Sequence, residues 1–132
     1  MKVETEFTNE QIIDLLTTAL EGGSNYWYYL NDEEVAKIRQ RFKKGNTLSL
    51  SEKIGKAILE KECSVKVTDV EDGDELGILN EDTIRKGFSA MLKENSGSVQ
   101  KEAIARIICD DYDDTDADVW FQMVIMGEII YG

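Results

Sequence analysis

Apolar residues recur every three or four positions through most of the chain, and this spacing predicts a largely helical protein. Thr8 and Gln11 fit a capping box at the start of a first helix, and Gly22–Gly23 is expected to end that helix in a left-handed turn. Asn31 is expected to cap a second helix that keeps Lys43–Lys44 in its last turn. Four further helices are expected to begin near Ser49 or Ser51, after Asn80, after the break at residues 95–98, and after a cap at Asp114 or Thr115.

In the middle of the chain the helical spacing gives way to strict alternation. The segment Cys63–Thr68 alternates apolar and polar residues, as a half-buried strand does. Asp72–Gly73 is a turn signal, and Leu76–Leu79 is expected to be the return strand. Ile129–Tyr131 is a candidate for a short C-terminal strand. Together these elements predict an α+β fold, with a small antiparallel β-hairpin packed with about six helices in a single compact domain over residues 1–132.

The same periodicity assigns core residues in the last two helices. Their inner sides are expected to carry Val99, Ala103, Ile104, Ile107 and Ile108 in one helix, and Ala117, Trp120, Phe121, Val124 and Ile125 in the other. The four consecutive aromatic residues Tyr26–Tyr29 cannot all point inward from one helix or strand, so one or two should be exposed. Within this run, Trp27 fits either a core position or a contact surface.

Charge and composition exclude several classes of function. Lys and Arg number 15 against 27 Asp and Glu, which gives a net charge of −12. Such a chain should have no general affinity for nucleic acid or for an anionic membrane. It contains no histidine, so the usual general base and the usual zinc ligand are missing, and we expect neither a cofactor nor a metal site. Residues 35–66 form the one basic segment.

Cysteine usage and the chain ends bear on localisation. Cys63 and Cys109 lie far apart and form no C-x-x-C pair, so we expect both to be reduced and buried, with a disulfide between them as the alternative. Residues 1–4 do not read as a secretory leader, and no apolar run approaches the roughly 18 residues of a membrane span. A cytoplasmic location is therefore expected.

Residues 110–118 contain six aspartates. The run does not fit a calcium-binding EF-hand loop, because a start at Asp114 puts Val119 where the loop needs glycine. A solvated loop before a helix is one interpretation, since a helix N-terminus favours carboxylates. The other is a surface for a partner, and the candidate binding residues are then Asp111, Asp113, Asp114 and Asp116.

Aromatic and basic residues define an alternative ligand surface over residues 26–44. A small anion or a nucleotide would use an aromatic face beside positive charge, and the candidates are Tyr26, Trp27, Lys37, Arg39 and Arg41. Catalytic residues are not predicted, because the paired carboxylates Glu10 and Asp14 come with no nucleophile. Gly22–Gly23 also lacks the context of a phosphate-binding loop.

Three segments carry a resemblance to known sequences. They are residues 18–27 around the double glycine, residues 67–87 with the hairpin, and residues 116–132 at the C-terminus. In these segments the chain resembles small acidic proteins of bacteriophages and prophage-like mobile elements. The resemblance implies a phage or mobile-element context, and with it a location in a bacterial host cell, and it transfers no site residues.

These observations together predict a non-enzymatic protein that binds a host or phage macromolecule through its acidic surface. The expected partner is a protein, for example a defence or nucleic-acid enzyme whose basic groove is made for phosphates. A small-anion or nucleotide binder that uses residues 26–44 is the alternative.

Overall fold

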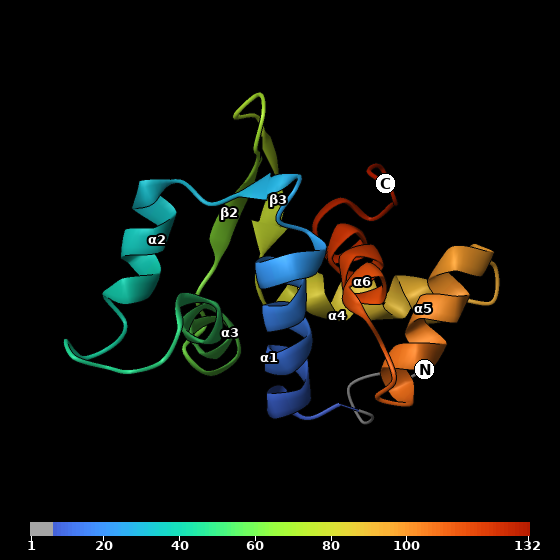
Figure 1. Cartoon of the computed structure of the whole chain (residues 1–132), viewed down its shortest axis with the longest axis horizontal. Helices are drawn as coiled ribbons and strands as arrows, with labels where there is room; N and C mark the ends of the chain where they lie inside the picture. Colours follow the sequence, from blue (N-terminus) through green and yellow to red (C-terminus); the bar gives the residue numbers. More distant parts are fainter. Residues whose placement is uncertain (1–6) are drawn as a thin grey trace.

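The computed structural model describes residues 7–132, so the expectation about a leader in residues 1–4 lies outside the described part of the chain. Over the described residues the chain forms six α-helices, a π-helical turn and a three-stranded antiparallel sheet with strand order β1-β2-β3 (Figure 1). The predicted α+β class is therefore confirmed. Among the helices of residues 7–132, none is long and apolar enough to cross a membrane.

The first helix begins as predicted and ends differently. Helix α1 spans Asn9–Thr18, and Thr8 and Gln11 form both hydrogen bonds of the capping box. The chain then continues into the π-helical turn η2, Ala19–Gly23. The predicted left-handed stop at the double glycine is wrong, because neither glycine has a positive φ. Glycine is needed there for another reason: a Cβ at Gly23 would collide with the backbone carbonyl oxygen of Asp114.

Helix α2, Asp32–Arg39, is shorter than predicted. Asn31 caps it as expected, but the amides of Arg41 and Phe42 bond three residues back, to Ile38 and Arg39, so tight turns replace the α-helical ladder. The two lysines at residues 43–44 therefore lie outside the helix. Helix α3, Leu50–Glu60, begins at the predicted cap Ser49.

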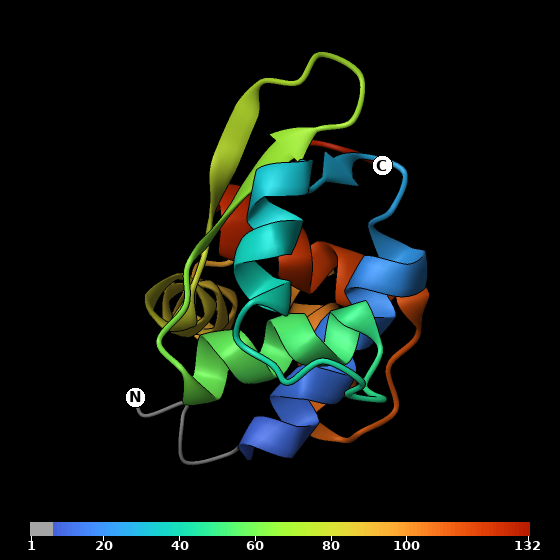
Figure 2. The ribbon, with the colours of Figure 1, turned by 90° about the vertical axis from the view of Figure 1, so that its left-hand side faces the viewer.

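The central hairpin is confirmed, and the sheet has one strand more than predicted. Strands β2, Val65–Asp69, and β3, Glu75–Leu79, join through a turn in which Gly73 has a φ of +74°. The tip of this hairpin projects beyond the helices (Figures 1 and 2). The extra strand β1, Tyr28–Tyr29, pairs with β2. The candidate strand at Ile129–Tyr131 does not form; these residues are held by a side chain, as described below.

The last three helices are α4, Glu81–Leu92, α5, Ser98–Ile108, and α6, Asp114–Met126. Helix α6 lies between α1 and α5 in Figure 1 and packs against α4, α5, η2 and β3. All ten residues from 116 to 125 are buried, so α6 is the central element of the core. Its cap is Asp113, one residue before the earlier of the two predicted caps, and Gly127 ends it in the left-handed conformation.

The inward face of α5 is narrower than predicted. Ala103, Ile104 and Ile107 are buried, whereas Val99 is 53% exposed and Ile108 is 47% exposed. The reason is that α5 lies at one edge of the molecule in Figure 1 and packs mainly against α4 and α6. The prediction for the cysteines is confirmed in part. Both cysteines are free and Cys63 is buried, as expected, but Cys109 is exposed.

A candidate binding cleft beside helix α6

A cleft of about 570 Å³ opens where the end of the first helix meets the start of the last. Its walls come from three segments that are far apart in the sequence. They are the double glycine of η2 with Tyr26, one face of α6 from Asp114 to Gln122, and the C-terminal residues 129–132. Exposed Val99 of α5 stands at its edge.

The carboxylate of Asp118 lies in the wall of this cleft and is only 7% exposed. Its Oδ1 accepts hydrogen bonds of 2.7 Å from the Ser24 hydroxyl and 2.7 Å from the Trp27 indole N–H. Its Oδ2 accepts bonds of 2.7 Å from the Tyr26 hydroxyl and 3.1 Å from the Gln122 amide. A carboxylate offers about four acceptor positions, so this one is fully bonded. All four donors are uncharged groups.

Gln122, one helical turn after Asp118, fixes the C-terminal segment. Its Oε1 accepts from the backbone N–H groups of Ile130, at 2.8 Å, and Tyr131, at 2.9 Å. Its Nε2 donates to the carbonyl oxygen of Tyr131 at 3.1 Å as well as to Asp118. One buried amide therefore makes three hydrogen bonds with the backbone of this segment, which pairs with no strand among the described residues.

Aromatic packing holds the same segment in place. The Tyr131 ring stacks on the Trp27 ring with centroids 5.3 Å apart and planes 11° apart, and its hydroxyl donates a 2.7 Å hydrogen bond to Asp69. This bond and partial burial raise the pKa of Tyr131 to about 12. Burial and the bond to Asp118 likewise raise the pKa of Tyr26 to about 12. Both hydroxyls therefore remain donors at neutral pH.

The four predicted acidic residues have different surroundings. Asp111 and Asp113 are exposed, with Asp113 acting as the α6 cap, and Asp114 is exposed in the cleft wall. Asp116 is buried, and Arg106 donates two hydrogen bonds of 2.8 Å to its carboxylate. Burial opposes ionisation of Asp116, but the Arg106 bonds hold its pKa below the usual value. Asp116 is thus an internal ion-pair partner, and whether the other three bind a partner stays a prediction.

The alternative aromatic and basic surface is divided in the structure. Trp27 is 1% exposed and belongs to the core, while Tyr26 is half exposed and faces the cleft. Lys37 binds Glu34 at 3.0 Å and the carbonyl oxygen of Ser64 at 3.2 Å, and it does not line the cleft. Two further members of the set are exposed along α2 and the turn after it, Arg39 and Arg41. The tyrosine and the basic residues therefore do not converge on one site.

Sequence reasoning missed three residues of the cleft, Asp118, Gln122 and Tyr131, and the buried Ser24 that donates to Asp118. Asp118 was counted only as part of the acidic run. A signal was present, because an acid and an amide four residues apart interrupt the apolar face of a strongly hydrophobic helix. A polar pair at that spacing inside a core helix must find buried hydrogen-bond partners.

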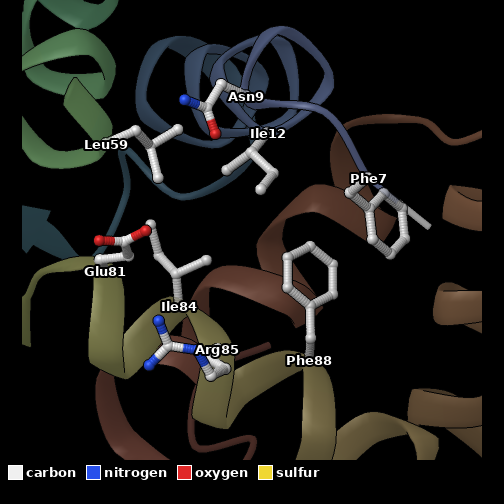
Figure 3. A pocket seen from close by; sticks show the side chains of 8 residues that line it. All are labelled: Phe7, Asn9, Ile12, Leu59, Glu81, Ile84, Arg85 and Phe88. Atoms are coloured by element: carbon white, nitrogen blue, oxygen red, sulfur yellow. The ribbon is translucent and has the colours of Figure 1, made fainter. Parts of the chain in front are cut away.

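A second hollow lies between α1, α3 and α4 and is shown in Figure 3. It has a volume of about 140 Å³, with apolar walls from Ile12, Leu59 and Ile84 and a stacked pair, Phe7 and Phe88, whose centroids are 4.6 Å apart. This is close to the roughly 150 Å³ of a cavity that holds one benzene molecule. Asn9, Glu81 and Arg85 also line this hollow, so its wall is mixed, as is the wall of the cleft beside α6.

Comparison with known proteins adds no relative. No family model, no curated protein and no solved structure matches the chain. The resemblance to phage and prophage proteins therefore stays a prediction.

Proposed function

We propose that the protein is a non-enzymatic binding protein whose acidic face receives a basic segment of a protein partner. The acidic face consists of the exposed residues Asp110, Asp111, Asp113 and Asp114 together with the cleft. The observation that carries the proposal is the position of Asp118: a buried carboxylate, bonded only to neutral donors, in the wall of an open cleft.

The electrostatics of this face favour a cationic partner. Within residues 7–132, none of the four exposed aspartates forms an ion pair with a lysine or arginine. Arg106, which pairs with Asp116, also attracts Asp113 and offsets part of their field. The field of Asp118 is screened less than theirs because the carboxylate is buried. A basic segment at the cleft would supply the counter-charge that the described chain does not.

The partner class follows from the same charge. A folded domain with a net charge of −12 and a concentrated acidic face can occupy a groove that binds phosphates. In a phage or mobile element, an enzyme of defence or nucleic-acid metabolism would offer such a groove. Electrostatic complementarity of this kind mainly accelerates association and excludes partners of the wrong charge.

The experiment compares two variants that remove the same three charges. The acidic-face variant is D111N/D113N/D114N, and asparagine at 113 can still cap α6. The control variant is D72N/D74N/E75Q at the hairpin tip, where these three residues are exposed. Immobilised wild type, acidic-face variant and control variant are used to capture proteins from a bacterial lysate, and each captured protein is then titrated against all three.

The expected result is a partner that binds wild type and control but binds the acidic-face variant at least about tenfold more weakly at 0.1 M salt. At 1 M salt, where the Debye length is about 3 Å, the difference should largely disappear. Equal binding by all three proteins, independent of salt, would contradict the proposal. Loss of binding in K37A/R39A/R41A instead would favour the anion-binding alternative.

A further inference from the structure

We infer that the cleft beside α6 holds an arginine side chain of the partner. This inference rests on the proposed function and makes it specific: it states which basic side chain the acidic face recognises and where that side chain lies. Three properties of the cleft support it, namely its charge, its aromatic wall and the absence of side chains at its glycine wall.

The charge of the cleft matches a cation. The exposed carboxylate of Asp114 stands in the wall, and the buried charge of Asp118 lies behind it. Because all acceptor positions of Asp118 are already filled, it acts through its field, and Asp114 is the group able to accept a new hydrogen bond. The helix formed by α1 and η2 also ends here with no basic residue in its last turn. The carbonyl oxygens of Leu20 and Glu21 already accept hydrogen bonds from Tyr28 and Asn25, so this helix end favours a cation through its dipole alone.

The start of α6 lies at the same place, and its positive end opposes a cation. A helix end corresponds to about half an elementary charge, whereas Asp113 and Asp114 each carry a full negative charge there. The carboxylates therefore outweigh the helix dipole. The net field at the mouth of the cleft is negative.

The aromatic wall distinguishes arginine from lysine. The Tyr26 side chain is half exposed, but its hydroxyl is anchored to Asp118 at 2.7 Å, so the ring is held in a fixed position. A guanidinium is planar and can stack on such a ring while its N–H groups bond a carboxylate. An ammonium is a compact, strongly hydrated charge and uses a ring face less well.

The glycine wall keeps Asp114 accessible. A Cβ at Gly22 would lie 3.0 Å from Oδ2 of Asp114, so any larger residue would crowd the carboxylate. With glycine, the carboxylate faces open space in a cleft of about 570 Å³. That volume is ample for one extended side chain.

Binding of three capped single residues tests the inference: N-acetyl arginine amide, the lysine analogue, and the citrulline analogue, which keeps the planar shape without the charge. The ¹⁵N-labelled full chain is titrated with each at low salt. The two indole N–H signals provide an internal control, because Trp27 bonds Asp118 in the cleft wall, whereas Trp120 packs on Phe88 away from it. We expect arginine to shift the Trp27 signal at about tenfold lower concentration than lysine, and citrulline to shift neither signal.

Matched variants locate the site. D114N should weaken arginine binding about tenfold, and D72N at the hairpin tip should leave it unchanged. Y26F keeps the aromatic ring and should retain most of the arginine binding, whereas Y26A removes the ring and should lose the binding. Y29A is the control, because Tyr29 is an exposed tyrosine on β1 (47% exposed) that does not line the cleft. Melting temperatures identify any variant that fails to fold. If Y26A does not fold, Y26F and D114N still test the inference.

The outcomes separate this inference from the proposed function. Equal shifts by arginine and lysine, or shifts unaffected by D114N, would overturn the arginine assignment while leaving the basic partner in place. Absence of any shift at Trp27, combined with capture of a partner that depends on the acidic face, would place the binding elsewhere on that face. If the acidic-face variant also captured the same partner, the proposed function itself would fail.

Discussion

The indole N–H of Trp27 donates a 2.7 Å hydrogen bond to Asp118, a residue 91 positions later in the chain. This bond joins the segment after η2 to the central helix α6. Ser24 and Tyr26 donate hydrogen bonds to the same carboxylate. Gln122 also donates to it and bonds the backbone of the C-terminal segment. One buried carboxylate therefore organises three segments, and the first prediction concerns its loss.

Asp118→Asn is expected to lower the free energy of unfolding by about 1–3 kcal/mol. The amide presents an –NH₂ group where one carboxylate oxygen accepts two hydrogen bonds, so buried donors lose their acceptor. Urea unfolding followed by tryptophan fluorescence measures the change. The matched substitution Asp114→Asn, on an exposed carboxylate of the same helix, should stay within about 0.5 kcal/mol. Equal stability of the two variants would show that the Asp118 network is dispensable.

The two glycines of η2 should respond differently to alanine. Gly23→Ala places a Cβ against the backbone carbonyl of Asp114, which cannot move without shifting α6, so we expect a loss of about 1–3 kcal/mol. Gly22→Ala meets only the flexible Asp114 side chain, and the better helix propensity of alanine offsets that contact. Its unfolding free energy should change by less than about 1 kcal/mol. The comparison fails if Gly22→Ala proves the more destabilising of the two.

The two tryptophans are both buried, but only one indole is bonded. Among the residues that the structure describes, none accepts a hydrogen bond from the indole N–H of Trp120, whereas the indole N–H of Trp27 donates to Asp118. Trp27→Phe should therefore cost about 1–2 kcal/mol more than Trp120→Phe, because it also leaves Asp118 short of a donor. Chemical denaturation of the two variants checks the difference. A larger loss for Trp120→Phe would mean that packing, not hydrogen bonding, dominates at both sites.

Alkaline pH should destabilise the fold through its bonded tyrosines. Folding raises the pKa of Tyr26 and Tyr131 from 10.0 to about 12, so the folded state holds these protons more tightly than the unfolded state. The resulting stability is complete below about pH 10 and is lost as the pH rises through about 12. Unfolding free energies at about pH 9 and about pH 11 should differ less in Tyr131→Phe than in wild type. An unchanged pH slope in that variant would exclude Tyr131 as a contributor.

Local signals predicted the starts of most helices correctly. The caps at Thr8, Asn31, Ser49 and Asn80 each use a side chain and an amide three residues apart, so the information lies within one turn of sequence. The hairpin turn at Gly73 is equally local, because two strands and a glycine with positive φ are adjacent in the chain. Where local signals compete with packing, as at the end of α2, the expected boundary was wrong.

The sequence by itself determined the α+β class, the hairpin, the helix caps, the excess of negative charge and the partial exposure of the aromatic run. Only the tertiary structure decided the third strand, the burial of Asp116 and Asp118, and the cleft. Strand β1 has two residues and pairs with a strand some 40 positions away, so it leaves no periodic signal. Asp118 meets Ser24 across 94 positions, and an exposed aspartate and a buried one are the same letter in the sequence. The two differ in the hydrogen-bond donors that folding brings to the carboxylate. Burial removes water from a carboxylate, and the free-energy cost is offset only where hydrogen bonds from the protein replace that water.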